Sequence, residues 1–182
     1  ETVLGGNDEL LFRREVDFAV CGHVPQGFAG EPLLPVRFIA AAHPDHPLHR
    51  LGRELTLDDL REHRHLVVRD TALERPRESG GWQGAEQRLT VSHKATQIAA
   101  AVQGLGFAWF AEHTIRRDLD EGLLAPLPLR EGRERHVHMY LVFADPDARG
   151  KAAMRLAEIL REDVAELCRE DAASTDVKRV AT

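Results

Sequence analysis

The sequence predicts an α/β protein with mostly parallel sheets. Short runs of β-branched and aromatic residues alternate with segments whose apolar residues repeat at helical spacing. The chain has 182 residues, which is enough for one large domain or two small lobes. In such a fold, right-handed crossovers place helix N-termini at the carboxyl ends of strands, and ligands bind there.

The first part of the chain is predicted to form a helix over 5–13 and a buried strand, VDFAVC, over 16–21. A loop rich in Gly and Pro leads to a second strand at 34–42, whose apolar run is typical of burial on both faces. Two prolines in HPDHPL end that strand. A short helix follows Thr56, and Asp59 at its third position completes a variant of the capping box.

The middle of the chain is predicted to contain a strand at 65–69, a loop at 70–86 and a strand at 87–91. Ser92 is expected to cap the next helix, because its hydroxyl can accept from the first-turn amides. Gly104 suits the left-handed residue that ends a helix. The apolar residues of this helix repeat at i, i+3, i+4 and i+7, so the core face is expected to consist of Ala95, Ile98, Ala99 and Val102. The flatter outer side, which consists of small residues, is expected to contain Gln97, Ala100 and Ala101.

The last part of the chain is predicted to form a strand at 107–111, a short helix stopped by Gly122, and a long strand, HVHMYLVFA, at 136–144. An amphipathic helix follows at 151–167. Residues 171–182 continue no apolar stripe and are predicted to be a mobile tail.

Composition narrows the class of protein. The formal net charge of -6 makes the chain as a whole a poor binder of polyanions. Cys21 and Cys168 lie far apart without metal-ligand spacing, which indicates reduced thiols and a reducing compartment. No apolar run approaches the roughly 18 residues of a membrane span, and the first residues are not a signal peptide. We therefore expect a cytoplasmic protein with no membrane partner.

Five motifs in a fixed order resemble the effector-binding, or substrate-binding, domain of LysR-type transcriptional regulators. They are VDFAV after a helix, AAHPDHPL after a strand, LTLDDLREHRHLVV, TVSHKATQIAAAVQGLGFAWF followed by RRDLDEGLLAPLPL, and MYLVFADPDARGKAAMRLAEIL. The start, ETVLGGNDELLFRREVDFAV, is similar to one branch of that family. The resemblance implies two Rossmann-like lobes joined by two hinge strands, as in type 2 periplasmic binding proteins.

The resemblance also implies the domain organisation. Lobe one would comprise 1–41 plus 137–170, lobe two would comprise 42–136, and the hinge strands would be 34–42 and 136–143. The family's helix-turn-helix, its linker helix and the first strand, helix and strand of lobe one would precede Glu1, so the chain is expected to be N-terminally truncated. DNA would then be bound only through that absent helix-turn-helix, and the full-length form would be a homo-oligomer.

The trio Ser92, His93 and Lys94 is the first candidate site. At a helix N-terminus the free amides and the helix dipole favour an anion, and Lys94 adds a full charge. The alternative is an ordinary capped helix with solvated side chains. A serine nucleophile is not indicated, because the GxSxG elbow is absent and no acid–base set is implied by the spacing.

Further candidates follow predicted strands or open a helix. Arg69 ends a strand together with Asp70 and Thr71, and its guanidinium could hold a carboxylate or form a surface salt bridge. Gly22 and His23 follow the strand VDFAVC and could contact a ligand or only fill a loop. The glycine pair beginning at Gly5 could let an anion approach bare amides, or could permit tight packing.

No metal, cofactor or catalytic group is predicted. Prolines interrupt the spacing of His43, His46 and His49, so these three cannot share the face of a regular helix. The Gly104–Gly106 pair follows a helix instead of opening one, unlike a phosphate loop. The favoured function is a regulatory domain that senses a small organic anion, expected to be a carboxylate, between the lobes. The alternative is a solute-binding protein of a transporter with the same fold, and an enzyme is disfavoured.

Overall fold

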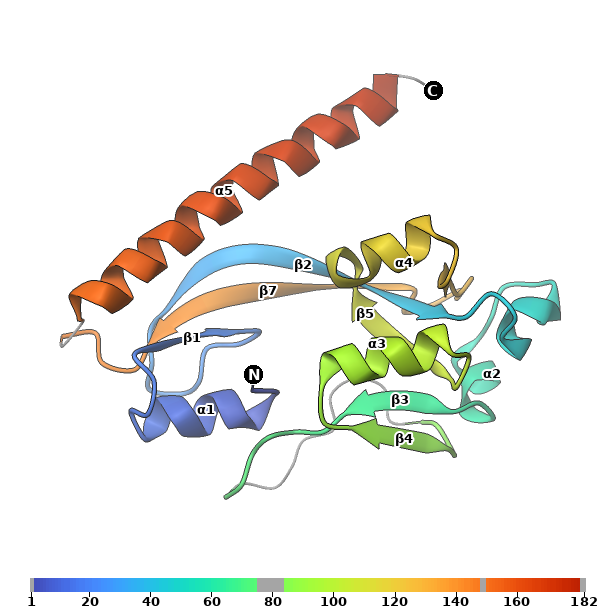
Figure 1. Ribbon diagram of the computed structural model, residues 1–182, viewed down its shortest axis with the longest axis horizontal. Helices are drawn as coiled ribbons and strands as arrows, with labels where there is room; N and C mark the ends of the chain where they lie inside the picture. Colours follow the sequence, from blue (N-terminus) through green and yellow to red (C-terminus); the bar gives the residue numbers. More distant parts are fainter. Residues whose placement is uncertain (1, 75–83, 148–149, 181–182) are drawn as a thin grey trace. The chain divides into compact units, whose positions relative to one another are not determined.

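The computed structural model describes residues 2–74, 84–147 and 150–180 (Figure 1). The chain forms two compact units. Unit 1 comprises Glu1–Glu9 and Val36–Val137, and unit 2 comprises Leu10–Pro35 and His138–Thr182. This division groups the first nine residues with the 36–137 body, whereas the sequence placed them in lobe one; the lobe boundaries stay a prediction.

Unit 2 is built around the pairing of two strands. β1 (Phe18–Cys21) runs antiparallel to the end of β7 (Glu134–Phe143), with Phe18 opposite Phe143. The second half of α1 (Gly5–Phe12), the start of β2 (Gly30–Ala42) and α5 (Lys151–Val180) complete the unit. The buried side chains of this unit include Leu11, Cys21, Leu141, Val142, Phe143 and Ala157.

Helix α5 is longer than the sequence analysis predicted. It continues to Val180, past Leu167 and through most of the expected tail. No glycine or proline occurs between 168 and 180, so nothing in that segment stops a helix, and its Ala, Glu, Lys and Arg residues are good helix formers. Whether the tail is mobile stays a prediction, and residues 181–182 lie outside the described residues.

Unit 1 has a mixed sheet in the order β2-β5-β3-β4, with β6 on β2. β3 is parallel to β4 and to β5, but β2 is antiparallel to both β5 and β6. Its elements after β2 are η1 (Pro47–Leu51), α2 (Leu57–Arg61), β3 (His65–Val68), β4 (Arg88–Val91), α3 (Lys94–Val102), β5 (Phe107–Ala111), η2 (Glu112–Ile115), α4 (Arg116–Asp120) and β6 (Ala125–Pro126).

The mostly parallel sheet was therefore a wrong prediction, and burial of the second strand on both faces was correct only for residues 39–42, since Arg37 within the predicted run is exposed. Successive side chains of a strand point to opposite faces. Ala41 lies in one apolar cluster of unit 1, and Ala40 and Ala42 lie in the other. An apolar run records burial on both faces but carries no information about strand direction.

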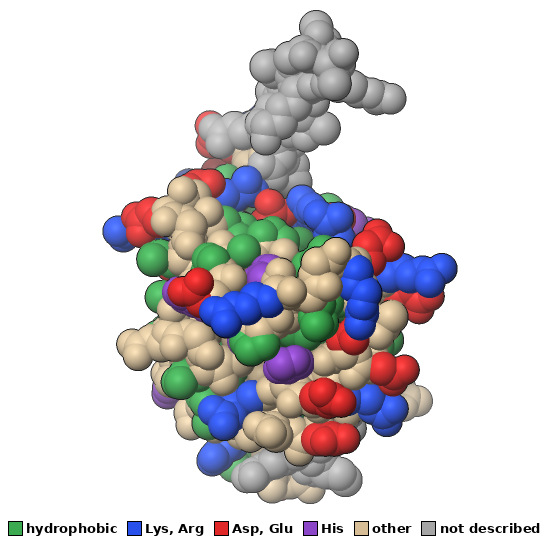
Figure 2. Space-filling view, turned by 90° about the vertical axis from the view of Figure 1, so that its right-hand side faces the viewer, with side chains coloured by type: hydrophobic (Ala, Val, Ile, Leu, Met, Phe, Trp, Pro, Cys, Tyr) green, Lys and Arg blue, Asp and Glu red, His purple; other side chains and the backbone are tan. Residues whose placement is uncertain are grey.

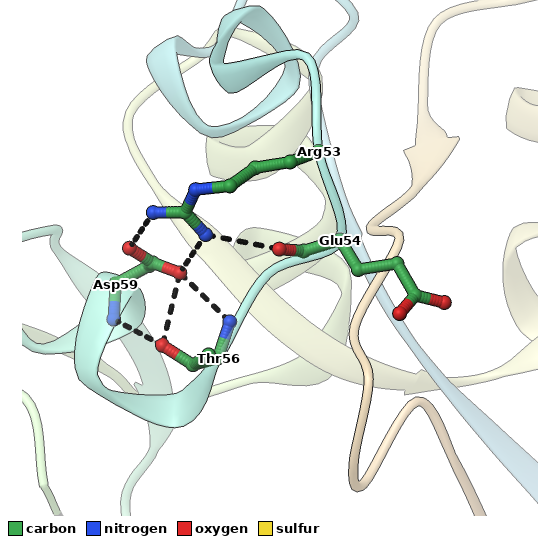
Figure 3. A network of polar contacts seen from close by, with 4 residues as sticks. All are labelled: Arg53, Glu54, Thr56 and Asp59. Carbon is green, nitrogen blue, oxygen red and sulfur yellow. Dashed lines mark hydrogen bonds and ion pairs between the residues drawn. The ribbon is translucent and has the colours of Figure 1, made fainter.

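The capping box at Thr56 is confirmed (Figure 3). The Thr56 hydroxyl accepts from the Asp59 amide, and the Asp59 carboxylate accepts from the Thr56 amide at 2.7 Å. Arg53 adds two hydrogen bonds to the same carboxylate, at 2.7 and 2.8 Å. Mainly through Arg53, and then through the Thr56 amide, these contacts hold the pKa of Asp59 well below its usual range.

The core-facing side of helix α3 only partly matches the prediction, because Ile98 and Val102 pack against the core as expected but the alanines do not follow the predicted assignment. Ala101 is fully buried and Ala100 nearly so, whereas Ala95 and Ala99 are exposed. Gln97 points inward, and its Nε2 donates to the Leu66 carbonyl at 2.8 Å. Because alanines occur on all sides of this helix, their pattern does not indicate which side faces the core. Ala100 and Ala101 are buried where the helix backbone lies close to the sheet, since a small side chain fits there.

Candidate functional site

The carboxyl ends of β3 and β4 bring two of the predicted residues together. Val68 and Val91 are partners in the parallel ladder, and the Arg69 amide donates to the Val91 carbonyl at 2.8 Å. Arg69 and Ser92 therefore follow paired residues on neighbouring strands, as the sequence predicted for strand ends. Both residues are exposed.

The N-terminus of α3 lies directly after Ser92. The prediction that Ser92 caps this helix was wrong, because the N-cap is His93, in an extended conformation with no side-chain cap hydrogen bond. Ser92, His93 and Lys94 are all exposed. Since the His93 side chain makes no cap hydrogen bond, the first-turn amides and the positive end of the helix dipole can attract an anion, and Lys94, the first residue of the helix, adds a positive charge.

Asp70 and Thr71 hold the loop after β3. The Asp70 carboxylate is buried and accepts from the Ala72 amide at 2.8 Å. The Thr71 hydroxyl accepts from the Val3 amide at 2.9 Å and donates to the Val3 carbonyl at 3.1 Å. A ligand role for these two side chains stays a prediction, and their observed contacts are structural.

The glycine pair at the start of α1 packs against that loop. A Cβ on Gly6 would lie 2.0 Å from the Thr71 hydroxyl oxygen, and one on Gly5 would lie 3.1 Å from the Ala72 methyl carbon. Of the two readings of this pair, the contacts favour tight packing. The sequence analysis did not identify Glu9, whose carboxylate accepts hydrogen bonds from the amides of Leu73 and Glu74. The only sign in the sequence of a close approach in this region was the nearby Gly5–Gly6 pair.

Gly22 and His23 belong to unit 2, where both are exposed directly after β1. Gly5, Arg69, Asp70, Thr71, Ser92, His93 and Lys94 belong to unit 1. That Gly22 and His23 share one ligand site with the unit 1 residues stays a prediction.

Histidines gather around the turn after β2. His46 is 7% exposed, its Nδ1 accepts from the Leu48 amide at 3.3 Å, and its ring lies 5.2 Å from that of His63. Burial, followed by the nearby His63, His49 and His43, lowers the pKa of His46 to about 4. Burial also lowers the pKa of His49. The described residues contain no group of three or more His, Cys, Asp or Glu able to hold a metal ion.

Charges on unit 1 are paired and interspersed. Arg37 on β2 bonds Glu112 and Glu134 at 2.7 Å each; the Glu134 hydrogen bond is the main cause that raises the pKa of Arg37, and Arg37 lowers the pKa of Glu134. Figure 2 shows blue and red side chains mixed over the end of unit 1 that carries η1 and α2, with histidines between them. That face offers no basic patch of the kind that binds a polyanion. Among the described helices, none is both long and apolar enough to cross a membrane.

Comparison with known proteins assigns the fold a family. Residues 6–165 match the model of the LysR substrate binding domain. Over 86 residues, 47% of this chain, it is 34% identical to the probable HTH-type transcriptional regulator YhaJ of Escherichia coli K12. The match spans only 29% of that regulator's length.

Solved structures agree in fold. The regulatory domain of CcmR from Synechocystis PCC6803, in complex with 2-PG, superposes with a TM-score of 0.62 at 12% identity, covering 86% of this chain and 77% of that one. The effector binding domain of QuiR in complex with shikimate gives a TM-score of 0.61 at 13% identity, covering 87% and 77%. At these identities the likeness shows the two-lobed α/β fold alone, as predicted.

Proposed function

Because the chain belongs to the LysR substrate-binding domain family, we propose that this effector-binding regulatory domain senses a small organic anion, and specifically a carboxylate. The observation that carries the proposal is the joint position of Arg69, Ser92 and the uncapped start of α3 at the ends of two parallel strands. These groups supply a guanidinium, a hydroxyl and helix amides to one small region of unit 1. An anion is the ligand class that all three can bind.

The binding energy of such a region is sufficient for a metabolite. The net charge of the chain is negative, so attraction must be local and not a property of the whole surface. A helix N-terminus contributes about 1 kcal/mol to an anion. Each charge-assisted hydrogen bond adds roughly 1.5–3 kcal/mol. Three or four such contacts reach the roughly 8 kcal/mol of micromolar binding.

The related structures support the choice of probes. CcmR was solved with 2-PG and QuiR with shikimate, which carries a carboxylate. We propose that the ligand of this chain binds between lobes that also include Gly22 and His23, and that closure of the lobes is the regulatory signal.

Calorimetry on the full-length protein with 2-PG, shikimate and a panel of other small carboxylates tests the proposal. Arg69→Ala is expected to weaken a positive ligand by about 10- to 100-fold, the equivalent of one charge-assisted bond. Ser92→Ala is expected to weaken it by about 10-fold, because the lost hydroxyl donates one charge-assisted hydrogen bond to the anion. The matched control is Arg88→Ala, an exposed arginine that begins β4 at the opposite end of the same strand. Equal affinities for all four proteins would rule this region out as the site.

The function of the whole protein is inferred from its relatives. The YhaJ relative is described as a helix-turn-helix regulator, so we propose that DNA is contacted through a segment outside residues 1–182, in a cytoplasmic homo-oligomer. The family match favours this function over the solute-binding alternative, because the family is one of transcriptional regulators. That the chain is not an enzyme stays a prediction. A DNA-mobility assay distinguishes the regulator from the solute-binding protein. The full-length protein is expected to shift DNA, and residues 1–182 alone are not.

A further inference from the structure

Two segments of unit 1 far apart in sequence are fastened together at several points. Thr71 bonds Val3 through three contacts, since its amide also donates to the Val3 carbonyl at 3.2 Å. The buried Gly6 lies so close to Thr71 that no side chain fits between them. The chain passes from unit 1 to unit 2 inside α1, directly after Glu9. The contacts therefore hold the start of the helix that leads into unit 2.

Glu9 makes the contact with the clearest chemical meaning. Its two carboxylate oxygens accept from the consecutive amides of Leu73 and Glu74, each at 2.8 Å. The residue is only 8% exposed. These lengths are typical of charge-assisted hydrogen bonds, and successive backbone amides that point at one anion form a standard anion-binding concavity. The side chain thus occupies a small carboxylate site on the loop.

We propose that segment 2–9 and loop 70–74 form a latch in which Glu9 is an internal carboxylate ligand of the Leu73 and Glu74 amides, so that a free carboxylate takes the same amides when Glu9 is removed. The latch closes only if Gly6 lacks a side chain, because a Cβ there would meet the Thr71 hydroxyl oxygen at 2.0 Å. This proposal does not depend on the identity of the effector.

The latch can be broken at two positions, Glu9 and Gly6. Removing the Glu9 carboxylate leaves the Leu73 and Glu74 amides without their acceptor. Adding a methyl group at Gly6 displaces Thr71, which precedes Leu73 and Glu74 in the same loop. If the contacts form one unit, the Gly6 change also exposes the Leu73 and Glu74 amides.

Hydrogen–deuterium exchange of the full-length protein, resolved to single amides by mass spectrometry, measures the latch directly. In Glu9→Ala the Leu73 and Glu74 amides are expected to exchange about tenfold faster. Sodium acetate, compared with the same concentration of sodium chloride, is expected to restore much of the lost protection in Glu9→Ala and to leave the unmodified protein unchanged. Gly6→Ala is expected to accelerate the same two amides with Glu9 intact.

Matched controls separate the latch from general loosening. Glu131→Ala removes an exposed carboxylate, and Gly150→Ala adds a methyl group where nothing lies within 4 Å. Glu9→Gln keeps the volume and serves if Glu9→Ala does not fold. Unchanged exchange in both Glu9 variants overturns the latch. If acetate and chloride protect the Leu73 and Glu74 amides of Glu9→Ala equally, the loop is not a carboxylate site. If Gly6→Ala accelerates exchange at Thr71 alone, the contacts do not form one unit.

Discussion

Acid should destabilise unit 1 through His46. In the folded chain the ring is buried, and its Nδ1 accepts from the Leu48 amide at the start of η1. A proton on Nδ1 would place two donors face to face and put a charge on a ring that is buried among other histidines. The pKa of His46 is therefore lowered from 6.5 to about 4, chiefly by burial and secondarily by the nearby His63 and His49.

The sign of the effect follows from linkage. A folded pKa below the unfolded one means that the unfolded chain binds the proton more tightly. The stabilisation is complete at pH 7 and is lost as the pH falls from about 6.5 through about 4. At about 1.36 kcal/mol per pKa unit, the full shift corresponds to at most about 3.4 kcal/mol. Partial hydration of the charged ring reduces this, so we expect a loss of about 2 kcal/mol.

The variant His46→Asn isolates this contribution. The asparagine Oδ1 can replace Nδ1 as the acceptor for the Leu48 amide, because Asn is a good N-cap residue, yet it does not titrate. The free energy of unfolding is measured by urea denaturation of both proteins at several pH values between 7 and 4. The difference between them should shift by about 2 kcal/mol in favour of the variant as the pH falls. His113→Asn, which changes an exposed histidine, serves as the control.

Parallel stability profiles for the unmodified protein and His46→Asn would refute the reasoning. That result would mean that the ring accepts a proton in the folded state as readily as in the unfolded chain. A shift of the same size in His113→Asn would equally contradict it, because the effect would then be general to histidines and not tied to burial.

Three further predictions concern stability, each read from urea denaturation at pH 7. Asp59→Ala should cost about 1 kcal/mol through loss of the capping box, whereas Asp58→Ala, on an exposed neighbour, should cost less than half of that; equal losses would contradict the capping role. Ala101→Leu should cost about 1–3 kcal/mol by overpacking the buried face of α3, and Ala99→Leu should be tolerated; the reverse order would restore the face that the sequence predicted. Gly106→Ala should cost about 2 kcal/mol, because its Cβ would lie 2.3 Å from a backbone carbonyl oxygen, and a neutral outcome would show that this contact relaxes freely.

Local chemistry in the sequence was enough to predict several features. The Thr56–Asp59 capping box depends on two side chains three positions apart, so it can be read without tertiary information. Gly104 is left-handed at the end of α3 as expected, with φ 72°. The motifs quoted for the family were correct over most of the chain, because they combine such local signals in a fixed order.

Tertiary packing decided the features that the sequence left undetermined or led astray. Ile98 and Val102 of α3 face the core as predicted, but which of its alanines are buried could not be inferred, since alanines on every side fit either orientation until the sheet demands a close approach. The antiparallel direction of β2 was equally hidden, because burial on both faces looks the same in either direction. The contact of Gly6 and Glu9 with the loop after β3 joins residues more than sixty positions apart, and no local pattern encodes such a meeting. Short-range caps and turns are thus written in neighbouring residues, whereas helix orientation, strand direction and the latch follow from which distant surfaces come together.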